Sequence, residues 1–164
     1  MKALVTYYSQ TGNTEKVART IYDAIDAEKE LLPVQDVKGA SGYDIIFVGF
    51  PVHAHSVPAK LLHFFKKLPA GQKIALFCTH GSLRGGHLPK QALEHAIGLS
   101  DGAKIIGTFS VRGKVDAKIL DSLMKQAEHR AWAEEAQGAD EHPSEADLAD
   151  GREFARNVLA RIRS

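Results

Sequence analysis

A short loop rich in hydroxyl side chains near the N-terminus constrains the fold of this chain more than any other stretch. The loop, Ser9–Thr14 (the hydroxyl loop below), follows an apolar run at Ala3–Tyr8 that predicts a strand. Apolar residues then recur at three- and four-residue steps over Glu15–Ala27, which predicts an amphipathic helix. A strand that turns straight into a helix presents backbone N–H groups and the positive end of the helix dipole to an anion.

The hydroxyl loop offers neutral donors only. Ser9, Thr11 and Thr14 supply three hydroxyl groups, and Gly12 allows a positive φ or a close approach to a ligand. The loop has neither the Gly-Lys-Ser/Thr of a P-loop nor the Gly-x-Gly-x-x-Gly of a dinucleotide fingerprint. The alternative is a plain turn, with Asn13 as turn former and Thr14 as the helix N-cap.

The rest of the chain alternates apolar runs with amphipathic segments. Strands are predicted at residues 31–37, 44–50, 73–78 and 104–109, and helices at residues 58–68, 89–99, 116–131 and 144–163. This alternation predicts a three-layer α/β fold with a five-stranded parallel sheet in the order 2-1-3-4-5. Pro33 agrees with that order, because it places the second strand at the edge, where a missing N–H is tolerated. Only residues 38–43 separate the second and third strands, so we expect an irregular turn there.

The pattern Ser9-x-Thr11-Gly12-x-Thr14 after an N-terminal strand resembles the FMN-phosphate loop of the flavodoxin family, and the strand spacing extends the resemblance over essentially the whole chain. The resemblance implies FMN as cofactor, its phosphate in the hydroxyl loop. Its ring would lie between a second loop, residues 51–56, and a third loop, residues 79–87. These loops meet at the topological switch point, where such sheets bind ligands. The implied cofactor-binding residues are Ser9, Gln10, Thr11, Gly12, Asn13, Thr14, Pro51, Val52, His53, Ala54, His55, Thr79, His80, Gly81, Gly85 and Gly86.

The second and third loops carry histidines where flavodoxins commonly have Trp and Tyr. They are His53, His55, His80 and His87, and we expect one or two to face the ring while His87 is solvated. A protonated imidazole there would stabilise negative charge on the reduced ring and could deliver a proton to an acceptor. The alternative is a zinc site, but the two loops contain no Cys or carboxylate. Cys78, at the end of a buried strand, is expected to pack as a small apolar residue.

The totals exclude several classes of protein. A chain of 164 residues predicts one domain over residues 1–164, and a formal net charge of +1 gives no indication of a nucleic-acid partner. No stretch reaches the length of a membrane span. The single cysteine and the direct start into a strand, without a secretory signal, predict a cytoplasmic protein.

Three functions from different classes fit these features. The favoured one is an FMN-dependent electron carrier between redox partners, a reductase or ferredoxin-like donor and an unknown acceptor. The second is an FMN-dependent reductase of a small conjugated acceptor of quinone or tetrapyrrole type, which the near-neutral charge and the loop histidines support. The third is a flavin-free phospho-ligand or receiver-type domain, but a receiver domain needs acidic residues where this chain has Tyr7 and Tyr8. An acidic run over residues 134–150 is either a docking face for a basic partner or solvated surface.

Overall fold

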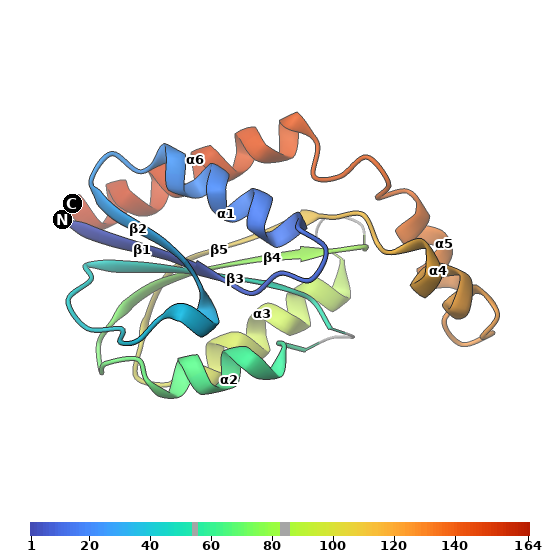
Figure 1. The fold of residues 1–164 in the computed structure, drawn as a ribbon, viewed down its shortest axis with the longest axis horizontal. Coiled ribbons are helices and arrows are strands. Elements are labelled where there is room, and N and C mark those ends of the chain that lie inside the picture. The colour runs from blue at the N-terminus through green and yellow to red at the C-terminus, as the bar shows by residue number, and fades with distance from the viewer. Residues whose placement is uncertain (54–55, 83–85) are drawn as a thin grey trace.

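The sheet has the strand order that the sequence predicts. The computed structural model describes residues 1–53, 56–82 and 86–164. The strands are β1 (Lys2–Tyr7), β2 (Glu28–Pro33), β3 (Ile45–Pro51), β4 (Lys73–His80) and β5 (Lys104–Arg112). They form one sheet in the order β2-β1-β3-β4-β5, and each neighbouring pair is parallel. Their carboxyl ends therefore meet at one edge (Figure 1).

Helices cover both faces of the sheet. They are α1 (Asn13–Ala24), α2 (Ala59–Lys66), α3 (His87–Leu99), α4 (Ala117–Met124), α5 (Arg130–Gln137) and α6 (Glu145–Arg163). Figure 1 shows α1 and α6 on one face and α2 and α3 on the other, which gives the predicted three layers. The last helix begins as the sequence predicts, and Ser144 and Asp147 form a capping box at its start.

The central strands pack against helices on both faces. Phe47 and Val158 belong to the core between the sheet and the α1–α6 layer. Phe50 and Leu61 belong to the second core, between the sheet and the α2–α3 layer. Cys78 lies fully buried in this second core, and burial raises the pKa of its thiol, so it packs as a small apolar residue as predicted.

β2 differs from its prediction at both ends. It begins earlier, at Glu28, and ends at Pro33, after which η1 (Val34–Asp36) forms a single 3₁₀ turn. Its first half is charged, and Lys2 Nζ on β1 lies 2.8 Å from a carboxylate oxygen of Glu30. An edge strand needs no continuous apolar run, so periodicity does not reveal these residues. The edge position of Pro33 is confirmed, and the chain reaches β3 through η1 and an irregular segment as expected.

The helix predicted over residues 116–131 begins where expected, with Asp116 as its N-cap, but the prediction that it continues to residue 131 is wrong. The structure has two shorter helices there, α4 and α5, joined by turns. Leu120, Leu123 and Met124, predicted to be buried, are only partly buried, and Ile119 is 52% exposed. The physical reason is position: α4 lies beyond the carboxyl edge of the sheet, outside the layers (Figure 1). Amphipathic periodicity predicts a helix but does not say whether another element covers its apolar face.

A side chain at Gly49 has no room between the central strands. Gly49 pairs with Phe77, and a methyl carbon placed on it would lie 2.1 Å from Cζ of that ring. We expect Gly49→Ala to lower the free energy of unfolding by about 2 kcal/mol or more, because the ring is fully buried in a close-packed core. Urea denaturation measures the change. Gly98→Ala on α3, where a methyl group meets no atom within 4 Å, is the matched control, and an equal effect of both would contradict the prediction.

Candidate functional site

The hydroxyl loop connects β1 to the start of α1. Gly12 is the N-cap residue, in place of Thr14, and takes the left-handed conformation with φ of 92°. Its N–H donates to Ser9 Oγ at 3.1 Å, which closes the turn. The first turn of a helix leaves its N–H groups without acceptors inside the helix, and here these groups lie beside the exposed side chain of Thr11. The loop therefore offers donors to an anion without a positively charged residue of its own.

Thr14 has a different role from the other two hydroxyl residues. It is buried, and its Oγ1 lies 2.8 Å from Oγ1 of Thr79, in a hydrogen bond that either hydroxyl can donate. Thr79 is in β4, so this bond joins the start of α1 to the central part of the sheet. Ser9 and Thr11 are more exposed and remain the hydroxyls available to a ligand.

The second loop closes against the hydroxyl loop. His53 Nε2 lies 2.9 Å from Oε1 of Gln10, and Tyr8 approaches the His53 ring edge-on with 6.3 Å between ring centroids. The backbones of His53 and Ser56 exchange two hydrogen bonds in an antiparallel bridge. Two predicted site residues, Gln10 and His53, thus meet across the switch point between β1 and β3.

His53 is neutral in this environment. Burial lowers the pKa of its imidazole, because desolvation disfavours the charged ring. An amide oxygen only accepts hydrogen bonds, so Nε2 of His53 carries the proton that it donates to Gln10. The ring can therefore present a hydrogen-bonding edge, and protonation requires a lower pH or a nearby negative charge.

The third loop begins later than the sequence predicts. Thr79 and His80 are the last two residues of β4, and both are buried. Strand pairing extends this far because Thr79 and His80 still pair with Val111 and Arg112 of β5. Gly86 is the N-cap residue of α3, whereas Ala54, His55 and Gly85 lie outside the described residues.

Gly81 is required for a reason that the sequence does not reveal. A methyl carbon there would lie 2.6 Å from Cγ2 of Val115 and 3.0 Å from Cβ of Ala136. The close neighbours of this glycine are therefore protein side chains that follow β5, among them Trp132. Arg112 also contacts this loop, since its guanidinium donates to the backbone carbonyl of Ser82. The roles of Trp132 and Arg112 were missed in the sequence analysis. The signals in the sequence were that Trp132 is the single tryptophan and that Arg112 lies just after the fifth apolar run.

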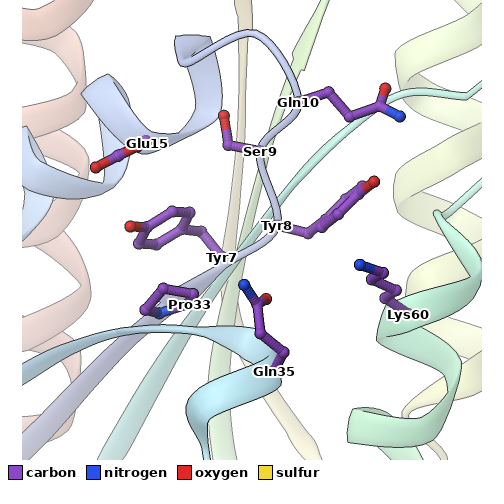
Figure 2. A pocket seen from close by; sticks show the side chains of 8 residues that line it. All are labelled: Tyr7, Tyr8, Ser9, Gln10, Glu15, Pro33, Gln35 and Lys60. Atoms are coloured by element: carbon purple, nitrogen blue, oxygen red, sulfur yellow. The ribbon is translucent and has the colours of Figure 1, made fainter.

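A pocket of about 410 Å³ adjoins the hydroxyl loop on the side of β2 (Figure 2). Figure 2 shows Tyr8 directed toward Lys60, whose Nζ lies 5.3 Å from the centre of the Tyr8 ring. Burial, with a smaller effect of Glu15, raises the pKa of the Tyr7 phenol, so it stays protonated. The lining residues are Tyr7, Tyr8, Ser9, Gln10, Glu15, Pro33, Gln35 and Lys60.

The described loop histidines have different surroundings, since His53 is half-buried and His80 is buried. His87 is exposed on α3 and bonds to Gln91, as expected for a solvated residue. In the described ranges no group of three or more His, Cys, Asp or Glu side chains is arranged to hold a metal ion. No helix in the described part of the chain is long and apolar enough to cross a membrane.

Sequence comparison decides the family. The profile of the flavodoxin domain matches residues 4–156. The chain belongs to the flavodoxin domain family. The chain is 29% identical over 171 residues to the flavodoxin-like domain-containing protein BilS of Clostridioides difficile, with 97% of each chain covered. It is 27% identical to the uncharacterized protein MJ0298 of Methanocaldococcus jannaschii, and the match covers 97% of this chain and 99% of that protein.

Solved structures share the fold of this flavodoxin. A short-chain flavodoxin associated with a bacterial microcompartment superimposes with a TM-score of 0.68 at 15% identity, over 99% of both chains. A flavoprotein from Lactobacillus acidophilus in complex with FMN superimposes with a TM-score of 0.55 at 21% identity, over 74% of this chain and 97% of its own. The sheet order, the hydroxyl loop and its neutral donors fit a phosphate-bearing ligand of this kind.

The buried Thr14–Thr79 pair is a testable part of this site. We expect Thr14→Val to lower the free energy of unfolding by about 1–3 kcal/mol, because Thr79 loses its partner while it stays buried. The double variant with Thr79→Val is expected to recover part of the loss, since two apolar groups of the same shape replace the pair. Urea denaturation measures both, with Thr108→Val on the exposed side of β5 as control. Strictly additive effects would contradict a direct bond.

Proposed function

We propose that this flavodoxin binds FMN and carries electrons between redox partner proteins. The observation that carries the proposal is the hydroxyl loop at the start of α1, next to the crevice that Gln10 and His53 bridge. Neutral hydroxyl and N–H donors at a helix N-terminus suit a phosphate group. When bound, FMN supplies one- and two-electron redox chemistry. The flavoprotein that forms a complex with FMN and has the same fold supports this assignment.

The proposed binding residues divide into two groups. The hydroxyls of Ser9 and Thr11 and the N–H groups of Gln10, Thr11, Asn13 and Thr14 would hold the phosphate. The Gly12 N–H stays bonded to Ser9, and the Thr14 hydroxyl stays bonded to Thr79. The second and third loops would hold the ring. Their residues in this proposal are Pro51, Val52, His53, Ala54, His55, Thr79, His80, Gly81, Gly85 and Gly86.

The proposed partners are a reductase or ferredoxin-like donor and an acceptor protein, in the cytoplasm. The acidic stretch over residues 134–150 is a weaker docking face than its sequence suggests. Basic neighbours neutralise three of its acids, in the pairs Lys114–Asp140, Arg130–Glu134 and Arg152–Glu145. Exposed pairs of this kind add little stability, but they reduce the net negative charge that would steer a basic partner.

A second function has one specific observation in its favour. The His53 imidazole is half-buried, neutral and hydrogen-bonded through Nε2 at the switch point. A ring held in this way can take up a proton and release it to a nearby acceptor. This supports an FMN-dependent reductase of a small conjugated acceptor, of quinone or tetrapyrrole type, as the alternative.

Absorption spectroscopy tests the cofactor and then separates the two functions. We expect purified protein to take up one equivalent of FMN and to turn yellow. An anaerobic reductive titration should then show two resolved one-electron steps for a carrier, or one two-electron step for a reductase. A protein that stays colourless in excess FMN would remove both functions.

Replacement of His53 tests the role of the loop histidines. We expect His53→Ala to lower the flavin midpoint potential by on the order of tens of millivolts, because the variant loses a group that stabilises negative charge near the ring. The difference should grow as the pH falls, since burial lowers the pKa of His53 and the imidazole gains its charge only in more acidic solution. His80→Ala should act in the same direction, and the exposed His87→Ala is the control. Unchanged potentials in both loop variants would exclude the role.

A further inference from the structure

The chain between β5 and α6 approaches the third loop from outside the layers. Figure 1 shows α4 and α5 beyond the carboxyl ends of the strands. The buried residues of α5 are Ala133 and Ala136, both almost fully inaccessible. Small side chains allow the helix to come close, and Cβ of Ala136 would lie 3.0 Å from a methyl carbon placed on Gly81. Helix α5 therefore packs directly on the backbone of the third loop.

Arg112 connects the third loop to the end of α5. Its Nε donates to the carbonyl of Ser82 at 3.0 Å, and one terminal nitrogen lies 3.4 Å from the carbonyl of Gly81. The same guanidinium donates to the carbonyls of Glu135 at 3.0 Å and Gly138 at 3.3 Å. Carbonyls at the end of a helix lack partners inside it, and a cation is favourable there. The half-buried Arg112 side chain thus connects the backbone of residues 81–82 to the backbone at the end of α5.

Trp132 holds the same two loop residues from α5. Its indole Nε1 donates to Oγ of Ser82 at 2.9 Å, and its ring lies 3.2 Å from where a methyl carbon on Gly81 would be. Ser82 is buried, although it lies outside the strands and helices. Gly81 and Ser82 are therefore contacted by both Arg112 and Trp132.

The segment after β5 also contacts the hydroxyl loop. Asn13 Nδ2 donates to the carbonyl of Lys114 at 2.8 Å, and Gly113 has no room for a side chain, because its Cβ would lie 2.8 Å from that nitrogen. The Gly113 N–H donates to the carbonyl of His80 at 2.8 Å. Backbone from residues 112–114 is thus bonded both to the hydroxyl loop and to the end of β4.

We propose that Arg112 and Trp132 are positioning residues that fix the Gly81–Ser82 backbone in the shape that receives the cofactor ring. The proposal rests on the proposed function, because it assigns the ring to the third loop. Neither residue needs to touch the ring. A loop that is ordered before binding loses less conformational entropy when the ligand arrives, and its affinity for the ligand is correspondingly higher.

Two variants test the proposal in the full-length chain. Arg112→Lys keeps the charge but loses the planar fork that reaches four carbonyls, and Trp132→Phe keeps an aromatic ring but loses the bond to Ser82. We expect FMN affinity to fall about tenfold in Arg112→Lys and about threefold in Trp132→Phe. The absorption bands of bound FMN should shift in both. Arg161→Lys is the matched control, because Arg161 donates to the carbonyl of Ile106, near the opposite end of β5.

A measurement without FMN separates this proposal from the proposed function. Amide relaxation of Gly81 and Ser82 in the FMN-free chain should show order parameters that fall from about 0.85 toward 0.6 in both variants, and that stay high in the control. If the wild-type chain takes up no FMN, the proposed function fails, and lower order parameters still support the positioning role.

Three results would overturn the positioning role. The first is unchanged order parameters in both variants. The second is an FMN affinity within twofold of the wild-type value despite a loosened loop. The third is strict additivity of the effects of Trp132→Phe and Ser82→Ala on FMN affinity. Both substitutions remove the same hydrogen bond, so the double variant should lose less affinity than the sum of the two. If Arg112→Lys does not fold, Trp132→Phe decides alone, because it retains most of the ring packing.

Discussion

Burial of β3 and β4 on both faces decides where this molecule can place polar groups. Helices cover the two faces, so the interior of each central strand is apolar, and polar side chains collect where the strands end. The Thr14–Thr79 bond lies at that boundary and satisfies two buried hydroxyls with each other. It also fixes the start of α1 relative to β4, and with it the donors of the hydroxyl loop.

The crevice at this edge is built by bonds between neighbouring connections. Gln10 and His53 join the hydroxyl loop to the second loop, and Val52 donates its N–H to the carbonyl of Thr79. Arg112 and Trp132 fix the third loop from the far side. The described parts of these connections are therefore linked to one another by hydrogen bonds.

Sequence patterns predicted the parts of the structure that depend on local order. The strand alternation, the edge position of Pro33 and the hydroxyl loop follow from periodicity and from the chemistry of single residue types. The extension of β4 through His80 was not predicted, because it depends on pairing with β5. The contacts of Arg112 and Trp132 with Ser82 join residues about 30 and 50 positions apart in the chain, so local sequence patterns do not predict them. Gly81 shows the difference: the sequence implies a cofactor-binding residue there, but its near neighbours in the structure are side chains from beyond β5.

Helix α4 has no fully buried side chain, and the contacts with the third loop come from α5 and from residues 112–115. Most substitutions on α4 should therefore change the free energy of unfolding little, because none of its side chains is fully buried. Packing therefore constrains the residues that contact Gly81 and Ser82, whereas the exposed residues of α4 can change without loss of the fold. The outer surface at this end of the molecule can vary in sequence while the backbone beneath it keeps its shape.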